Sequence, residues 1–505
     1  MSLNFILCIH NHQPIGNFED IMESAYRQSY EPFLNLIDKF PKIKLCMHYS
    51  GPLLEYLTRS HPKFISRLQK MVNDERLEIL GGGFYEPILT MLTDDDRIGQ
   101  IVSFSDYLEK LFGKRPRGVW LAERVWEQNL VKSLAQAGVE YTIIDDFHFK
   151  TSGFLGKELA GYFISEDQGK TISIFPIPER LRYMIPFKEP IETINYLSHY
   201  RQDSYKNTDT VICYADDGEK FGLWPKTYEH CYQNGWLERF FQTLNDAQDP
   251  PDRQAGWLKI TTYSEVIDKI KPIGKAYIPS GSYREMTEWV LSTDAKMLYE
   301  NYKQHQTSSS EFTLNPGGFW RNFLVKYPEI NIMYSKMMEV SKALASSTEQ
   351  HLKKDSRKLA DARRELYQGQ GNCAYWHGVF GGFYLPHLRH AVYHHLITAE
   401  EIISKLETSH PLSQKQTKNI IDKDDFDYDG YPELRYSNKI INCYFKPSQG
   451  AALYEMDIIP KKFNPLATLR RKQESYHQKI LQAQGKNSVT NVATIHDIVV
   501  SKVAG

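Results

Sequence analysis

The amino-acid sequence predicts an α/β protein whose first part is a barrel of parallel strands. Short apolar runs alternate with amphipathic stretches up to about residue 280. Helical periodicity then prevails from Trp289 to Leu406, and short β-rich pieces follow from about Leu412. Alternating strands and helices are typical of a parallel sheet. We therefore expect a barrel over residues 1–288, a helical bundle over 289–410 and a β-rich region over 411–505.

Eight apolar runs in the first region have the length of a buried strand. They are residues 5–9, 43–47, 77–80, 118–121, 141–144, 171–175, 211–213 and 257–260. Residues 67–75 and 130–138 between them have the pattern of amphipathic helices, and Gly138 is placed to end the second. Seven or eight such units favour a closed barrel over an open doubly wound sheet, which stays the alternative.

Polar side chains follow five of these runs. They are His10, Asn11 and His12, then Tyr85 and Glu86, then Glu123, then Asp145 and Asp146, and last Asp216 and Asp217. The carboxyl ends of parallel strands meet at one face of a barrel, so we expect an active site there. Glu78 lies inside the run RLEIL, and must face the barrel interior or an exposed edge.

The composition argues against several classes of protein. Sixty-one Lys and Arg balance 62 Asp and Glu, which leaves no electrostatic footprint for nucleic acid or a membrane surface. The six cysteines form no CxxC pair and the N-terminus has no signal-peptide pattern, so we expect a cytoplasmic protein. No apolar stretch approaches the roughly 18 residues of a transmembrane helix. Aromatic residues make up 13%, which indicates a contact surface besides the core. The oligomeric state stays open, with a homodimer as one alternative.

Two acidic segments have the residues that glycosidic bond cleavage needs. That reaction uses two carboxyl groups, one as nucleophile or base and one as a proton donor. Glu123 lies between two tryptophans in GVWLAERVWE, and Asp216 and Asp217 precede Glu219 in CYADDGEKFGLW. Crowded carboxylates repel, so one of them should have a raised pKa. A solvated acidic loop is the other interpretation of DDGE.

The sequence resembles glycoside hydrolase family 57, in the branch that contains 4-α-glucanotransferases and α-amylases. The matching segments are HNHQP (10–14), GGFYEP (82–87), WLAERVWE (120–127), DDGEKFGLWP (216–225), SYREMTEW (282–289) and AYWHGVFGGFYLPHLR (374–389). The resemblance implies a (β/α)7 barrel followed by a helical bundle and a C-terminal β-sandwich. Members of this branch continue well beyond the point where this sequence stops, so the sandwich looks truncated and would have unpaired strand edges.

The resemblance also implies a retaining reaction without a catalytic cofactor. Glu123 would be the nucleophile and Asp217 the acid/base, with Asp216 as a supporting neighbour. The substrate would be an α-1,4-glucan or a maltooligosaccharide. Transfer to a second glucan is our first choice, because YIPSGSYREMTEWVL and RYMIPF match glucanotransferase-type members. Hydrolysis of the α-amylase type is the alternative, since the two differ only in whether water is excluded as acceptor.

Sugars need aromatic platforms for their C–H faces and polar partners for their hydroxyls. The candidate platforms are Trp120, Trp126, Trp224, Trp289 and Trp376, and the candidate hydroxyl binders are His10, His12, Glu78, Glu86, Glu219, Glu288 and His377. Core packing is the alternative role for each tryptophan.

Cys373 departs from the family pattern. Relatives usually read NDA where this sequence reads NCA, so a cysteine replaces an aspartate that is thought to bind sugar. A thiol is a poor partner for a hydroxyl, which predicts weaker binding or a changed acceptor preference. A small thiol that only packs is the structural alternative.

Two other functions stay open at the level of sequence. His10 and His12, with Asp145, Asp146 and His148, could form the metal site of a hydrolase or carbohydrate deacetylase. Gln13 and Pro14 stand against it, because related metal sites have an acidic ligand there. A glucan-binding homologue with weakened catalysis is the second, with Cys373 as its support.

A short motif in the β-rich region predicts a structural calcium loop. Asp425, Asp427 and Asp429 precede Gly430 in DFDYDG, the spacing at which a calcium loop begins. Position twelve is Tyr436 instead of Glu, so a full EF-hand is excluded. An acidic turn is the alternative.

Overall fold

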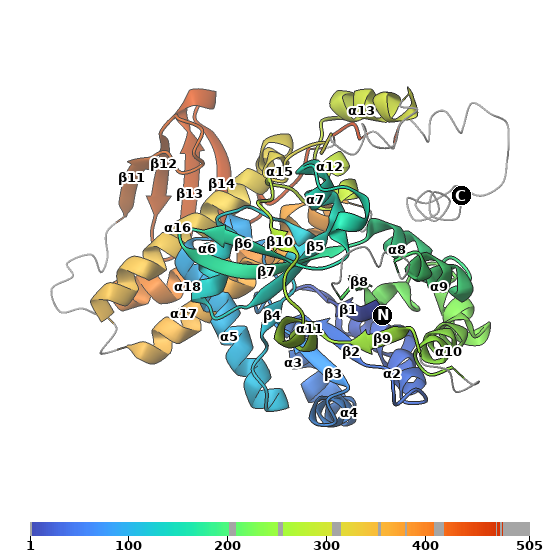
Figure 1. The fold of residues 1–505 in the computed structure, drawn as a ribbon. Coiled ribbons are helices and arrows are strands. Elements are labelled where there is room, and N and C mark those ends of the chain that lie inside the picture. Colours follow the sequence, from blue (N-terminus) through green and yellow to red (C-terminus); the bar gives the residue numbers. More distant parts are fainter. Residues whose placement is uncertain are drawn as a thin grey trace, which may run out of the picture.

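The computed structural model describes residues 3–200, 209–250, 256–305, 315–351, 355–378, 381–408, 419–470, 472–474 and 477. At its centre is a ring of seven parallel strands (Figure 1). They are β1 (Leu3–Asn11), β2 (Leu45–Tyr49), β3 (Leu77–Leu80), β4 (Gly118–Val119), β5 (Tyr141–Asp145), β7 (Lys170–Ile177) and β8 (Val211–Asp217). All eight predicted runs overlap strands, and the eighth forms β9 (Leu258–Thr261), which pairs with the first half of β1.

The ring is assembled from two hydrogen-bonded sheets. One has the order β3, β2, β1, β8, and the other contains β7, β5 and β4 with β6 (Phe163–Asp167) and β10 (Gly274–Lys275) added beside β7. Main-chain bonds of Gly81 with Gly118 (2.8 Å) and Trp120 (2.9 Å) join the sheets beside β4. On the other side the Cys213 thiol of β8 donates to the Pro176 carbonyl of β7 at 3.0 Å. The predicted barrel is therefore confirmed over the open sheet.

Helices surround the ring. They are α1 (Glu19–Ala25), α2 (Glu31–Ile37), α3 (Gly51–Ser60), α4 (Pro62–Asn73), α5 (Asp94–Phe112), α6 (Leu130–Gln136), α7 (Asp146–Thr151), α8 (Glu179–Met184), α9 (Pro190–Ser198), α10 (Trp236–Gln248) and α11 (Tyr263–Lys269). Every residue of β1, β2 and β5 is buried, as expected for parallel strands covered on both faces. Gly138 follows α6 with φ 82°, the left-handed conformation predicted for it.

The helices after the barrel share a hydrophobic core with it. α12 (Arg284–Trp289) and α13 (Thr293–His305) lead to the bundle helices α15 (Asn322–Lys326), α16 (Pro328–His351), α17 (Ser356–Gly369) and α18 (Pro386–Thr408). One cluster of buried side chains includes Leu130 and Ile144 from the barrel together with Trp320, Met337 and Leu396 from the bundle. The bundle is therefore packed directly on one side of the barrel.

The β-rich region forms a four-stranded antiparallel sheet beside α16 (Figure 1). Its strands are β11 (Ile420–Asp424), β12 (Glu433–Ser437), β13 (Ile441–Lys446) and β14 (Ala452–Ile458). The buried ammonium of Lys336 from α16 binds Asp457 at 2.8 Å and Glu400 at 2.6 Å. Within the described residues this region is one sheet, and residues 478–505 lie outside them. None of the described helices is both long and apolar enough to cross a bilayer.

Gly222→Ala should destabilise the protein by about 3 kcal/mol or more, because Gly222 has φ 138° and an added Cβ would lie 2.0 Å from the Gln28 carbonyl oxygen. Gly138→Ala is the matched control, since its φ is also positive but nothing lies within 4 Å of the added Cβ. We expect a cost of about 1 kcal/mol there. Urea unfolding of both variants measures the difference, and equal losses would contradict the steric argument.

Candidate active site

Glu123 lies in a left-handed turn directly after β4. Glu123 and Arg124 have φ values of 52° and 48°, which are uncommon for residues with a Cβ. The Glu123 carboxylate accepts a hydrogen bond from the Tyr283 hydroxyl at 2.9 Å, and its carbonyl accepts one from Ser282 at 2.6 Å. Burial and the charge of Asp217 raise the pKa of Glu123 to about 7. The turn thus holds a half-buried carboxyl group beyond the C-terminal end of a barrel strand.

Asp216 and Asp217 end β8 and have opposite electrostatic environments. Asp216 is fully buried and contacts Arg124 (3.2 Å), Arg182 (3.4 Å) and Lys220. Burial alone would raise the pKa of Asp216, but these three cations hold it well below its usual range. Burial and the Asp216 charge raise the pKa of Asp217 instead. Of the pair, Asp217 is therefore the residue suited to carry a proton.

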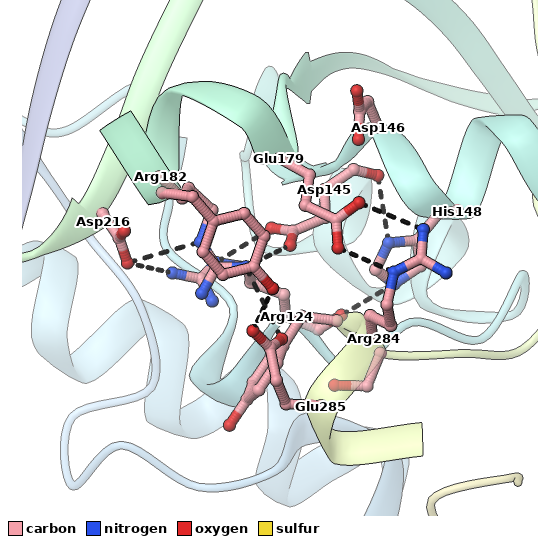
Figure 2. Close-up of polar contacts among 12 residues, drawn as sticks. Arg124, Asp145, Asp146, His148, Glu179, Arg182, Asp216, Arg284 and Glu285 are labelled. Carbon is pink, nitrogen blue, oxygen red and sulfur yellow. Dashed lines mark hydrogen bonds and ion pairs between the residues drawn. The ribbon is translucent and has the colours of Figure 1, made fainter. Parts of the chain in front are cut away.

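Asp216 belongs to a network of buried charges that also contains Arg124, Arg182 and Asp145 (Figure 2). Asp145 binds Arg124 at 3.2 Å and Arg182 at 2.7 Å, and both arginines also reach Asp216. His148 lies 3.1 Å from each of two main-chain carbonyl oxygens, those of Asp145 and Arg124. Sequence reasoning missed Arg182, although its segment RYMIPF was singled out for its resemblance.

Two further carboxyl groups complete the cluster. Glu219 accepts hydrogen bonds from the Tyr30 hydroxyl at 2.7 Å and the His12 main-chain N–H at 3.1 Å. Burial and Asp217 raise the pKa of Glu219 to about 7. Burial, followed by the charge of Glu123, raises the pKa of Glu86 well above its usual range. The crowding of these groups favours protonated forms of some of them at neutral pH.

The predicted residues His10, Trp120 and Glu86 meet at the carboxyl ends of the first strands. The His10 ring stacks on Trp120 with centroids 4.3 Å apart, and its Nε2 lies 3.6 Å from the Glu86 carboxylate. His48, which pairs with His10 in the parallel register of β1 and β2, places its Nδ1 2.9 Å from His10 Nδ1. His48 is not among the residues expected from the sequence, and its position on the strand next to His10 was the available signal.

The ring nitrogens of His10 and His48 are better suited to hydrogen bonding than to holding a metal ion. In the described part of the chain, the groups of three potential ligands are His10, His48 and Glu86, and the three aspartates of the predicted calcium loop. One proton lies between the two Nδ1 atoms, so only one of the two neutral rings has a bare Nε2. The predicted metal set of His10 and His12 with Asp145, Asp146 and His148 is not brought together.

The bundle supplies residues to the same place. The Cys373 thiol lies 3.2 Å from His12 Nε2, and the Asn372 amide donates to the Glu86 carbonyl at 2.6 Å. Trp376 donates to the Asn372 side chain at 3.0 Å and stacks on Trp289 with centroids 6.1 Å apart. The segment before α18 is therefore fixed against the barrel by hydrogen bonds to the loop after β3.

Other predicted site residues occupy different surroundings. Trp126 is fully buried and donates to the Ile278 carbonyl at 3.1 Å, so the structure corrects its predicted role as a platform to core packing. Glu78 faces the barrel interior, and it is bound by Tyr141 (2.7 Å) and the Ser264 main chain (3.1 Å). These bonds make it a connection between strands instead of a hydroxyl binder.

Three further predicted residues have partners other than the reacting carboxyl groups. Trp224 lies 5.2 Å from the Lys220 ammonium, which itself binds Asp216. Glu288 pairs with Lys303 at 3.1 Å. His377 Nδ1 lies 3.1 Å from the Gly381 carbonyl, and burial lowers the pKa of His377 to about 4.

A parallel barrel with crowded carboxyl groups at the ends of its strands has the features of a glycoside hydrolase. The family model described as glycosyl hydrolase family 57 matches residues 6–279. Models described as the middle and C-terminal domains of alpha-amylase/4-alpha-glucanotransferase match residues 318–403 and 425–505. The chain belongs to glycosyl hydrolase family 57.

Similar proteins cover almost the whole chain. Alpha-amylase 1 of Dictyoglomus thermophilum is 41% identical over 96% of this chain and 68% of its own length. The 4-alpha-glucanotransferase of Thermococcus kodakarensis is 39% identical over 98% and 71%. The crystal structure of 4-alpha-glucanotransferase from Thermococcus litoralis superimposes with a TM-score of 0.84 at 38% identity, over 98% of this chain and 72% of that one.

Cys373→Asp should raise kcat/KM on maltooligosaccharides about tenfold, because a carboxylate accepts hydrogen bonds from sugar hydroxyls more strongly than a thiol does. It would also raise the pKa of His12, which burial lowers to about 4. Cys373→Ser is the control, since it changes the atom without adding charge. Steady-state kinetics measure both variants. An unchanged Cys373→Asp enzyme would mean that the cysteine is neutral or compensated elsewhere.

Proposed function

We propose that this protein is a retaining 4-α-glucanotransferase that moves α-1,4-glucan segments through a glycosyl-enzyme intermediate. One observation supports the proposal most: Glu123 follows β4 and Asp217 ends β8, and Asp217 lies close enough for its charge to raise the pKa of Glu123. Relatives that carry the name 4-alpha-glucanotransferase align over 98% of the chain.

The reaction divides between these two carboxyl groups. Glu123 attacks the anomeric carbon while Asp217 gives its proton to the departing glycosidic oxygen. Asp217 then removes the proton from the incoming glucan hydroxyl, which displaces Glu123 from the anomeric carbon. Asp216 stays ionised throughout because three cations bind it. Its fixed charge favours the protonated form of Asp217 before the first step.

The surrounding side chains fit an uncharged sugar. Trp289 is partly exposed and stacks on Trp376 near the cluster, and His10, His12, Glu86 and Glu219 offer polar atoms. Trp120 is buried against His10 and Arg124, so it supports the site by packing. The proposed substrate is an α-1,4-glucan or maltooligosaccharide. A cytoplasmic location and a homodimer stay predictions from the sequence.

Hydrolysis of the α-amylase type is the second candidate. The observation that favours it is the 41% identity to a protein named alpha-amylase 1. Both reactions use the same glycosyl-enzyme, and they differ in whether water or a glucan hydroxyl completes the second step.

Incubation with maltotriose separates the two candidates. Transfer yields a ladder of longer maltooligosaccharides, whereas hydrolysis yields only glucose and maltose.

Glu123→Gln and Asp217→Asn should each lose about 10³-fold or more in activity, because each removes one of the two reacting groups. Glu127→Gln is the matched control, since Glu127 pairs with Arg321 at 2.8 Å away from the carboxyl cluster. A fluorinated glycosyl donor should label Glu123 covalently. Labelling of a different residue would contradict the assignment of Glu123 as the nucleophile.

We also propose that the loop of Asp425, Asp427 and Asp429 binds a structural calcium ion. Their carboxylate atoms lie within 4.8 Å of one another. Lys446 contacts Asp427 and, at 3.1 Å, Asp429, so one positive charge already lies beside the loop. Asp427 Oδ1 and Glu433 Oε1 are nevertheless buried without a hydrogen-bond partner. Oxygen donors without partners beside an excess of negative charge fit a hard cation.

Addition of 1 mM CaCl₂ after EDTA treatment should raise the melting temperature by several degrees. A ligand that binds only the folded state stabilises it, and a calcium concentration about 100 times the Kd gives a shift of this size. Asp427→Asn should abolish the rise and leave glucan activity unchanged. Differential scanning calorimetry measures both. Identical melting in EDTA and calcium would mean that Lys446 alone neutralises the loop.

A further inference from the structure

Residues 281–283 lie against the turn that carries Glu123. Gly281 and Trp126 exchange two main-chain hydrogen bonds, at 2.9 and 3.0 Å. The Ser282 hydroxyl binds the Glu123 carbonyl, and the Tyr283 hydroxyl binds the Glu123 carboxylate. The segment therefore contacts the turn at three successive residues, two of which hold Glu123 itself.

The direction of both side-chain bonds is fixed by chemistry. A carbonyl oxygen only accepts, and so does an ionised carboxylate, so Ser282 donates to the Glu123 carbonyl and Tyr283 donates to the Glu123 carboxylate. Burial and the neighbouring Glu123 charge raise the pKa of Tyr283 well above its usual range, so its hydroxyl keeps its proton. Tyr283 is therefore the donor to Glu123 whenever Glu123 is ionised.

The Tyr283 ring is itself held in place. The guanidinium groups of Arg124 and Arg182 lie 5.3 and 5.4 Å from its centroid, and Trp289 contacts it edge-on at 6.0 Å. Both arginines are fixed by Asp145 and by Asp216. The hydroxyl position thus depends on the same charge network that supports Asp217.

This arrangement matters because Glu123 must be ionised to attack. Burial and Asp217 favour its protonated form, and the Tyr283 hydrogen bond is the first of the interactions that oppose them. The other groups that interact with it electrostatically are Arg124 of the same turn, Arg182 of α8, Glu86 after β3 and Cys373 before α18.

We propose that Ser282 and Tyr283 are positioning residues for the nucleophile: Ser282 holds the main chain of the left-handed turn, and Tyr283 orients the Glu123 carboxylate and keeps it anionic. When Glu123 forms a bond to the anomeric carbon, the glycosidic bond breaks and its electron pair leaves with the departing oxygen, which Asp217 protonates. The carboxylate loses its charge and the Tyr283 bond weakens. Tyr283 keeps its own proton and binds the carboxylate again when the acceptor displaces it. The proposal rests on the proposed function.

Three variants separate charge from geometry. Tyr283→Phe removes the hydroxyl but keeps the ring between the two guanidiniums. Ser282→Ala removes only the bond to the main chain. Tyr162→Phe is the control, because its hydroxyl also donates a hydrogen bond, to the Ile270 carbonyl at 2.7 Å, outside the carboxyl cluster. Circular dichroism and melting temperature check that each variant is folded.

Tyr283→Phe should lower kcat about 10- to 100-fold with little change in KM, because a hydrogen bond to a charged group is lost. The acid limb of its pH–kcat/KM profile should move to higher pH, since more Glu123 is protonated at a given pH. Ser282→Ala should lower kcat without moving that limb. Tyr162→Phe should change neither.

A readout that needs no activity distinguishes this inference from the proposed function. The infrared band of the protonated Glu123 carboxyl, identified by its absence in Glu123→Gln, reports its titration directly. In folded Tyr283→Phe the titration should move to higher pH. An unmoved band, or kcat within twofold of the original enzyme, would overturn the role of Tyr283. Wild-type protein without glucan activity would instead refute the proposed function.

Discussion

The buried negative charge of Asp216 is the constraint on which the site depends. A carboxylate that is fully removed from water needs paired cations, and Arg124, Arg182 and Lys220 supply them. Because Arg124 is tied to Asp216, the turn that it shares with Glu123 is fixed. The same ion keeps its neighbour Asp217 inclined to hold a proton. One buried charge therefore sets both the geometry of the proposed nucleophile and the proton affinity of the proposed acid/base.

Electrostatic crowding gives the carboxyl groups different duties. Glu123, Glu219 and Glu86 all have raised pKa values because burial acts on each, but their partners differ. Glu123 has two nearby arginines and a tyrosine donor, which favour its anion. Glu219 has the Tyr30 hydroxyl and a main-chain N–H, and Glu86 faces two neutral imidazoles. Identical functional groups are thus separated by their neighbours and not by their own chemistry.

The barrel could be predicted from the sequence, because each buried parallel strand has a continuous run of apolar residues. It also placed His10, Glu86, Glu123 and Asp217 together, since strand ends converge at one face. It could not reveal Arg182, His48 or Tyr283. Their roles come from contacts between residues far apart in the chain, and a lone Arg, His or Tyr has no local pattern to mark it. The prediction for Trp126 was wrong for a different reason: its place in a matched motif does not show whether its ring points to the core or to the site.

The continuous core between barrel and bundle has an evolutionary consequence. Leu130 and Ile144 pack in one cluster with Trp320 and Leu396, while Asn372 binds the loop that carries Glu86. Recombination that replaced one part with a homologue's would break this packing unless both faces changed together. The bundle segment that brings Cys373 to His12 would therefore have to be exchanged together with its barrel.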